Sequence, residues 1–408
     1  MLPEINARRD QSSRIVAHWW RLGSIRRTIL ARTTTGVRRR AGGAMTATET
    51  FAGSSAGALP SDEPLALIAA DGSPVEGSGL RRPADDVVLD LYSAMVLGRR
   101  FDAQATALTK QGRLAVYPSS RGQEACQVGA VRALQERDWL FPTYRDSVAI
   151  VTRGVDPVAA LTLLRGNWHL GYDPYELRVA PQCTPLATNS CHAVGFARAA
   201  ALKGESTAAL VMMGDGATSE GDAHEAFNFA AVWSAPVVFL VQNNGYAISV
   251  PTNKQSAART FAHKGIGYGM SAQYVDGNDA AAVTVAVGDA LEHARRGGGP
   301  TLIEARTYRI EAHTNADDAS RYRSNDEVLL WLARDPVDRL DHYLSARGSL
   351  DTFARQAIAD HAESFAESFR QRMSVDPELD TEDLFRHVYA DPPEHLRRQA
   401  RRVAADAA

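Results

Sequence analysis

The sequence predicts an α/β fold in which a doubly wound, mostly parallel sheet carries helices on both faces, followed by a helical C-terminal region. The clearest evidence is the apolar run 208–213, which stops at Gly214-Asp215-Gly216 and is followed by an amphipathic segment, 220–232. A second apolar run, 236–241, then stops at Asn243-Asn244-Gly245-Tyr246. This order of strand, loop, helix, strand and loop is typical of a βαβ unit, and strand-like and helical segments continue on both sides of it.

The remaining elements follow from periodicity and from Gly, Pro and polar boundaries. Upstream, the pattern predicts a short strand at 65–69, a strand entering the loop 138–145, and helices at 85–111, 125–135, 157–165 and 193–202. Downstream, it predicts a strand at 273–275, a helix capped by Asn278 and ending at 296, a strand at 302–308, and helices at 327–333, 336–346 and 350–373. The alternation supports one large α/β domain with helices at its C-terminal end.

Polar side chains follow the two strands of the central βαβ unit. Parallel strands joined by a right-handed crossover end at the same edge of a sheet, so we expect Asp215 and Asn244 to lie side by side. A carboxylate, an amide oxygen and the backbone carbonyl of Tyr246 suit Mg²⁺, which usually completes its shell with phosphate oxygens and water. Gly214 and Gly216 allow a close approach of phosphate to the backbone. The sequence therefore predicts a metal-diphosphate site.

Composition excludes several classes of protein. The 408 residues are 45% hydrophobic and 23% charged, as in globular proteins. Cys126, Cys183 and Cys191 contain no C-x-x-C pair, which argues against a zinc site or a disulfide framework and fits a reducing compartment. No apolar run approaches the ~18 residues that span a bilayer, so we expect a soluble protein without a membrane partner.

Charge is concentrated at the N-terminus. Residues 1–44 hold ten arginines and two acidic residues, a balance of +8 that leaves −11 for the rest of a chain with a total of −3. The acidic body argues against a nucleic-acid partner. The basic segment is interpreted as a dispensable extension ahead of a true start at Met45, with a transit peptide or a phosphate-binding arm as alternatives. Residues 1–60 as a whole are predicted to be a disordered extension.

Several segments together resemble one protein family. GDGATSEGDAHEAFNFAA, NNGYAIS, VDGND and LIEARTYRIEAHTNADDASRYRS are similar to the alpha subunit of the thiamine diphosphate-dependent decarboxylating component of 2-oxo acid dehydrogenase complexes. The branched-chain type is the nearest, and the pyruvate type is the alternative. An acetoin-cleaving relative or a non-catalytic cofactor-binding module remains open as a further interpretation. The resemblance implies the thiamine diphosphate-binding fold, with thiamine diphosphate and Mg²⁺ as cofactors.

The resemblance also assigns expected roles to particular residues. It implies that Asp215, Asn244 and Tyr246 hold the metal ion. It implies cofactor contacts for Tyr144, Arg145, Thr184, Leu186, Gly214, Asp215, Gly216, Ala217, Asn244, Tyr246 and His313. Among these, Arg145 is expected at the diphosphate because a guanidinium fork suits its oxygens. Leu186 and Thr184 are expected beside the aminopyrimidine ring.

His313 is the expected catalytic residue, because the resemblance implies that a histidine at this place takes part in acyl transfer to the lipoyl arm. An imidazole suits proton transfer near neutral pH. Two departures from the family pattern accompany it. Glu311-Ala312 precede the histidine where the family usually has Gly-His or Gly-Pro, and Gln242 stands where animal branched-chain enzymes place an arginine. Substrate detail and cofactor affinity are therefore left open.

The resemblance covers about residues 85–390 and implies a partner. The glutamate that activates the cofactor ring is expected from a beta subunit, in an assembly of two alpha and two beta chains. Further expected partners are the lipoyl domain of the acyltransferase and a small 2-oxo acid. We expect a cofactor-binding domain over 61–345, a subunit-contact region over 346–408, and a bacterial cytoplasmic location, with the mitochondrial matrix as the alternative.

Overall fold

The computed structural model describes residues 59–166, 170–376 and 380–407. The chain divides into two units, 1–52 and 53–408. The first unit lies wholly outside the described residues, and only residues 59 and 60 of the predicted extension over 1–60 are described, so the extension stays a prediction. The described helices and strands all belong to the second unit.

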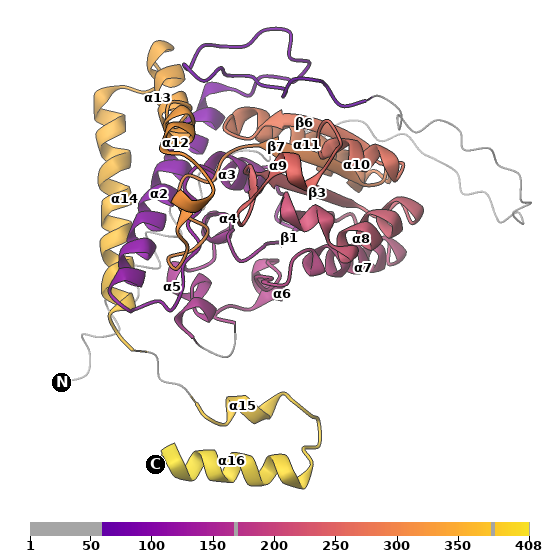
Figure 1. Ribbon diagram of the computed structural model, residues 1–408, viewed down its shortest axis with the longest axis vertical. Helices are drawn as coiled ribbons and strands as arrows, with labels where there is room; N and C mark the ends of the chain where they lie inside the picture. The colour runs from indigo at the N-terminus through magenta and orange to yellow at the C-terminus, as the bar shows by residue number, and fades with distance from the viewer. Residues whose placement is uncertain (1–58, 167–169, 377–379, 408) are drawn as a thin grey trace, which may run out of the picture. The chain divides into compact units, whose positions relative to one another are not determined.

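A five-stranded parallel sheet forms the centre of this unit (Figure 1). Its strands lie in the order β1-β2-β3-β7-β6. Their bounds are β1 Trp139–Phe141, β2 Ala209–Gly214, β3 Val237–Asn243, β7 Thr301–Arg306 and β6 Ser271–Asp276. The register pairs Gly214 of β2 with Gln242 of β3, so these two strands end together. The predicted mostly parallel sheet is confirmed.

The central strands β2 and β3 are mostly apolar because both faces of the sheet are covered. Leu210, Leu240 and Ile303 enter one core cluster, while their neighbours Val211 and Phe239 enter the other. The first cluster includes side chains of α2 Asp85–Lys110, α3 Glu124–Arg132, α4 Ser147–Arg153 and α11 Ala280–Arg295. The second includes side chains of α7 Thr188–Leu202, α8 Gly221–Val232 and α10 Ala262–Gly267. The fold is thus doubly wound, as predicted.

The direction of each crossover explains which face its helix covers. The connection from β2 to β3 contains α8 and runs along the sheet from the β1 edge toward the β6 edge. The connection from β6 to β7 contains α11 and runs in the opposite direction. Since parallel crossovers are right-handed, opposite steps place the helices on opposite faces. All carboxyl ends nevertheless meet at one edge, which is where such sheets bind ligands.

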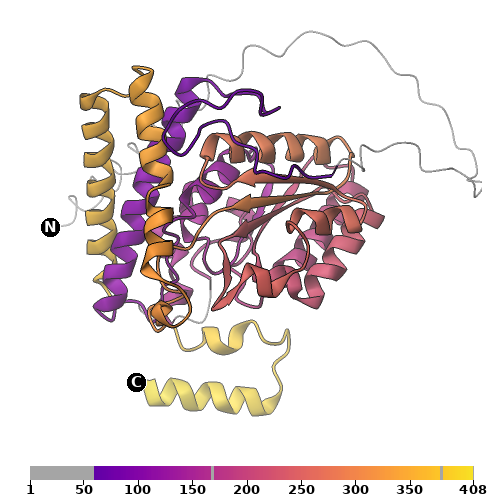
Figure 2. The ribbon, with the colours of Figure 1, turned by 45° about the horizontal axis from the view of Figure 1, so that its top comes forward.

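Helices beyond the sheet complete the first core. Helix α14 Thr352–Met373 lies beside α2, and Phe369 of α14 contacts Phe101 of α2 with ring centroids 5.1 Å apart (Figure 2). The other C-terminal helices are α12 Asn325–Leu332, α13 Pro336–Ala346, α15 Asp383–Arg386 and α16 Glu394–Ala407. Short elements fill the loops: α5 Pro157–Ala160, α6 Pro174–Leu177, α9 Thr252–Gln255, and an antiparallel pair, β4 Tyr246–Ala247 and β5 Val250–Pro251.

Three local predictions need correction. The predicted helix at 157–165 divides into α5 and a 3-10 helix, Leu163–Arg165. The predicted strand at 65–69 forms only isolated bridges, Leu65 with Val275 and Ile68 with Pro74. Helix α11 is capped by Asp279 rather than Asn278, because the Asp279 carboxylate accepts the backbone N–H groups of Ala281 and Ala282. Asn278 instead donates its amide to the carbonyl of Arg334. Among the described residues, no helix is long and apolar enough to cross a membrane.

Candidate functional site

Asp215 and Asn244 meet where β2 and β3 end. Asp215 is buried, and burial raises the pKa of its carboxyl; hydrogen bonds from Gln255 and from the backbone N–H of Asn244 act in the opposite direction. Gln255 donates from Nε2 to Asp215 Oδ2 at 2.6 Å. A buried carboxylate served only by neutral donors remains a strong acceptor for a cation. We call this end of the site, formed by Asp215, Asn244 and Tyr246, the metal end.

The amide of Asn244 has a defined orientation. Its Nδ2 donates to Gln123 Oε1 at 3.0 Å, and its Oδ1 accepts the backbone N–H of Tyr246 at 3.2 Å. The Tyr246 hydroxyl donates to Glu327 at 2.8 Å, which fixes the ring. Arg309 Nη1 approaches that carbonyl at 3.5 Å. The three predicted metal-binding residues therefore lie in one loop cluster.

The glycines of the loop have different neighbours. A Cβ on Gly216 would meet the Cβ of Ala247 at 2.6 Å, whereas a Cβ on Gly214 would meet nothing within 4 Å. Packing explains the glycine at 216 but leaves open space at 214, where a ligand can approach the backbone. Ala217 is buried in the 3-10 helix Gly216–Ser219, which precedes α8. The loop thus turns through a tight 3-10 helix before the expected α-helix begins at Gly221.

Two buried arginines converge on His313. Arg145 Nη2 lies 3.0 Å from His313 Nδ1, and Arg309 Nη1 lies 3.4 Å from the same atom. Arg145 is 6% exposed and Arg309 1% exposed. Arg145 also donates to the carbonyls of Ser119 and His313, and Arg309 to the carbonyl of Ile248 and the hydroxyl of Tyr322. None of these partners carries a negative charge. This group of Arg145, Arg309 and His313 is called the basic end.

The geometry fixes the state of the His313 ring. Guanidinium groups only donate, so Nδ1 is the acceptor and the ring proton is on Nε2. Burial lowers the pKa of His313 to about 4, and the positive charges of Arg145 and Arg309 act in the same direction. Asp317 Oδ2 accepts the backbone N–H of His313 at 2.7 Å. The ring of Tyr144 lies edge-on to His313, with centroids 6.1 Å apart. The imidazole is therefore neutral at physiological pH.

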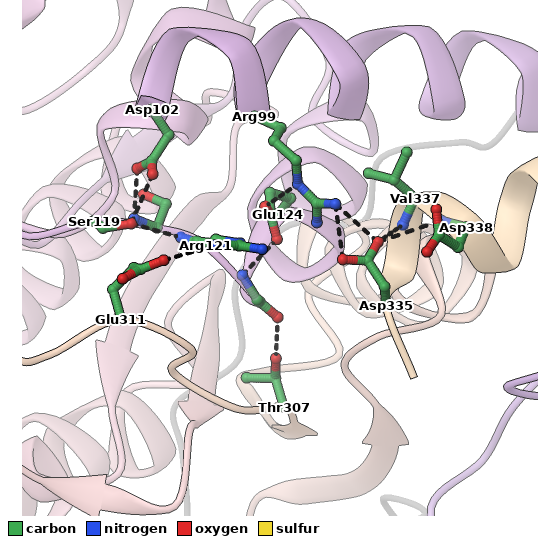
Figure 3. A network of polar contacts seen from close by, with 12 residues as sticks. Arg99, Asp102, Ser119, Arg121, Glu124, Thr307, Glu311, Asp335, Val337 and Asp338 are labelled. Carbon is green, nitrogen blue, oxygen red and sulfur yellow. Dashed lines mark hydrogen bonds and ion pairs between the residues drawn. The ribbon is translucent and has the colours of Figure 1, made fainter. Parts of the chain in front are cut away.

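A polar network supports the loop after β7 (Figure 3). Glu124 accepts the backbone N–H of Gly122 at 2.7 Å and the Nε of Arg99 at 2.8 Å. Thr307 donates to the carbonyl of Gly122 at 2.7 Å. Gly122 has a φ of +93°, and a Cβ there would meet the carbonyl of Tyr308 at 2.2 Å, so only glycine fits. The turn and the strand end are thereby fastened together.

Glu311 has a partner in the same network. Arg121 Nη1 donates to Glu311 Oε1 at 2.9 Å, and both side chains are partly exposed. The pair joins the Gly122 turn to the loop that carries His313. The departure from the family pattern at Glu311-Ala312 thus introduces a surface ion pair, which we expect to contribute little to stability.

The segment with Thr184 and Leu186 lies next to the basic end. Cys183 forms a parallel bridge with Thr143, and its carbonyl accepts the N–H of Tyr144 at 3.2 Å. Thr184 is exposed and Leu186 is 39% exposed. Their side chains are thus open to a ligand, and their contact with the aminopyrimidine stays a prediction.

Three functional candidates were absent from the sequence-based set. Arg309 lies against His313, Gln255 donates to Asp215, and Gln123 accepts from Asn244. Arg309 has one sequence signal: it lies in the same loop as His313, four positions earlier. Gln255 and Gln123 have none, because a glutamine in a loop carries no distinctive chemistry.

The donor set fits a metal-diphosphate cofactor. The metal end offers one carboxylate, one amide oxygen and one carbonyl, which are the oxygen ligands Mg²⁺ takes. The basic end offers two guanidinium groups whose described partners are neutral, and Arg309 Nε is buried with no acceptor among the described residues. An anion would satisfy both groups.

Comparisons with known proteins show the family of this chain. The family described as Dehydrogenase E1 component matches residues 92–380. A 3-methyl-2-oxobutanoate dehydrogenase subunit alpha from Mycobacterium tuberculosis is 42% identical over 347 residues, 85% of this chain and 95% of the relative. A pyruvate dehydrogenase E1 component subunit alpha from Staphylococcus aureus is 35% identical over 316 residues, 77% of this chain and 85% of the relative. The corresponding subunit from Acholeplasma laidlawii is 34% identical over 316 residues, 77% of this chain and 92% of the relative. The chain therefore belongs to the dehydrogenase E1 component family, as an alpha-type chain of the 2-oxo acid dehydrogenases.

Proposed function

We propose that this chain is the alpha subunit of a branched-chain 2-oxo acid dehydrogenase, acting on 3-methyl-2-oxobutanoate and related acids. Family membership implies thiamine diphosphate and a beta subunit. The observation that carries the proposal is the pairing of a buried carboxylate, Asp215, with two buried guanidinium groups whose partners in the described part of the chain are neutral. This arrangement suits a cation and a diphosphate held together.

Each end of the site has a task. Asp215, the Oδ1 of Asn244 and the carbonyl of Tyr246 would hold Mg²⁺, while Arg145 and Arg309 would face the diphosphate. Thiamine diphosphate, when bound, supplies the electron sink for decarboxylation. The protein supplies position and charge, and the exposed side chains of Thr184 and Leu186 would line the cofactor ring.

His313 would act at the reacting end. Its proton is on Nε2, so the ring can donate a hydrogen bond from that atom toward the substrate or the acyl group. Asp317 holds the backbone N–H of His313, and the two arginines hold its ring in place. Acyl transfer to the lipoyl domain of an acyltransferase would follow. The ring-activating glutamate would come from the beta chain, in an assembly of two alpha and two beta chains.

Substrate choice is tested by co-expression with candidate beta chains. We expect the isolated chain to be inactive and the assembled enzyme to decarboxylate 3-methyl-2-oxobutanoate with a higher kcat/KM than pyruvate. A preference for pyruvate would favour the alternative suggested by the Staphylococcus aureus relative, a pyruvate dehydrogenase alpha subunit. Turnover by the chain alone would contradict the need for a beta subunit. The bacterial cytoplasm remains the proposed location.

A further inference from the structure

A chain of buried side-chain amides connects Asn244 to Asp146. Asn244 Nδ2 donates to Gln123 Oε1 at 3.0 Å, Gln123 Nε2 donates to Gln242 Oε1 at 3.1 Å, and Gln242 Nε2 donates to Asp146 Oδ1 at 2.7 Å. All four residues are buried. Every link therefore points in the same direction, from the metal end toward Asp146.

The carboxylate at the end of the chain determines this direction. Asp146 Oδ2 accepts both the backbone N–H and the hydroxyl of Thr143, each at 2.7 Å, so Asp146 serves as an acceptor at both oxygens. A carboxylate acceptor requires the NH₂ of Gln242, which turns the Gln242 oxygen toward Gln123. The same rule then turns the Gln123 oxygen toward Asn244.

The consequence reaches the metal end. Because Gln123 takes the NH₂ of Asn244, the Oδ1 of Asn244 is left on the side of Tyr246, whose N–H it accepts. We propose that Asp146, acting through Gln242 and Gln123, is a positioning residue that orients the Asn244 amide with its oxygen toward the Mg²⁺ position. This inference rests on the proposed function. It also gives Gln242 a role, because its side chain relays the orientation of the amides.

The variant Asp146→Asn tests the direction of the chain. The N–H of Thr143 still needs an acceptor, so the oxygen of the substituted amide stays there and its NH₂ faces Gln242. Either every amide then reverses, so that Asn244 presents NH₂ to the metal and to the N–H of Tyr246, or two donors meet at another link of the buried chain. We expect an affinity loss of about 10–100-fold for Mn²⁺, as for other outer-shell changes. The measurement is electron paramagnetic resonance of Mn²⁺ titrated into the alpha–beta assembly with saturating thiamine diphosphate.

The double variant Asp146→Asn/Gln242→Glu is the matched control. The carboxylate introduced at position 242 accepts both from the amide introduced at position 146 and from the NH₂ of Gln123. The carboxylate has thus moved one link along the chain, and the direction at Asn244 is restored. We expect Mn²⁺ affinity to return close to that of the wild type. Gln242→Glu alone places two carboxylates together and should not bind better than the wild type.

Four outcomes are decisive. The inference would be overturned if folded Asp146→Asn bound Mn²⁺ with unchanged affinity. It would also be overturned if the double variant bound Mn²⁺ as weakly as Asp146→Asn while both variants had the same thermal unfolding midpoint. Should Asp146→Asn not fold, Gln242→Met interrupts the chain without touching Thr143; it should weaken Mn²⁺ binding, and unchanged binding would equally overturn the inference. A wild-type assembly that binds thiamine diphosphate without any divalent cation would instead overturn the proposed metal site, and the inference with it.

Discussion

The metal end and the basic end of the site are assembled in different ways. Asp215 and Asn244 follow neighbouring strands of one βαβ unit, so the register of β2 and β3 brings them together. Arg145 follows β1, whereas Arg309 and His313 follow β7, and these two strands are separated in the sheet by β2 and β3. The metal end therefore depends on local topology, and the basic end depends on contacts between distant loops.

The two ends also carry opposite charges. The buried carboxylate of Asp215 has neutral hydrogen-bond partners, and the buried guanidinium groups of Arg145 and Arg309 have neutral partners too. Isolated charges in a protein interior are costly, and a ligand of complementary charge lowers that cost. We therefore expect the two ends to bind a metal-diphosphate ligand together. Single substitutions can remove the charge of either end separately.

The largest effect is expected from Asp215→Asn. The substitution removes the charge of the proposed metal ligand and preserves its shape, so Mg²⁺-dependent binding of thiamine diphosphate should fall by more than the ~100-fold seen for outer-shell changes. Isothermal titration of thiamine diphosphate into the alpha–beta assembly, at varied Mg²⁺, measures the loss. Glu205→Gln, an exposed carboxylate in the loop before β2, is the matched control. Equal loss in both variants would contradict a specific metal end.

A smaller effect is expected from Arg309→Met. The variant removes one guanidinium from the basic end and keeps a long buried side chain. Charged hydrogen bonds contribute about 1.5–3 kcal/mol, which corresponds to a loss of about 10–150-fold in affinity for thiamine diphosphate. Arg121→Met provides the contrast, because its partly exposed pair with Glu311 should be worth less than about 1 kcal/mol. Titration calorimetry at saturating Mg²⁺ compares the two variants.

The outcome separates the two ends. A weaker apparent Mg²⁺ affinity together with weaker diphosphate affinity in Arg309→Met would indicate that the ends act as a unit. Comparable losses in Arg309→Met and Arg121→Met would contradict the assignment of Arg309 to an anion.

The same comparison explains what the sequence could predict. Adjacent strand ends follow from hydrophobic runs and crossover handedness, so the meeting of Asp215 and Asn244 was predictable from the sequence. The burial of Arg309 was not, because it depends on the Ile248 carbonyl, in a residue with φ of 55°, and on the Tyr322 hydroxyl. Such contacts join segments whose spacing carries no periodic signal.

The role of Gln242 was beyond sequence reasoning for a related reason. Gln242 precedes the asparagine pair, where animal branched-chain enzymes place an arginine, so the sequence suggested only the loss of a positively charged side chain. Its side chain instead lies between Gln123 and Asp146, from two other loops. The N-cap of α11 was also hard to predict, because Asn278 and Asp279 are both good capping residues. In the structure Asp279 is the cap, and its carboxylate also accepts the N–H groups of Leu67 and Ile68, which are distant in the sequence.

The smallest expected effect is a pH dependence centred on His313. Its pKa is lowered from 6.5 to about 4 in the folded chain. As pH falls from about 6.5 to about 4, the unfolded chain gains a proton that the folded chain does not, so this group's contribution to stability decreases over that window. Histidine hydrogen–deuterium exchange followed by mass spectrometry reports the pKa directly. Urea unfolding at pH 7 and pH 5 should show a smaller pH effect in His313→Asn than in the wild type.

Binding of the cofactor should reverse the shift. Diphosphate oxygens between the two guanidinium groups would offset the positive charge that faces Nδ1, so the pKa of His313 should rise when thiamine diphosphate and Mg²⁺ bind. Arg309→Met should raise it in the free assembly as well, because one of the two charges is gone. If the pKa of His313 in the free wild-type assembly were already 6.5, the arginines would not be held against the ring. The basic end would then form only around the ligand, whereas the metal end would still be built in advance by the strands.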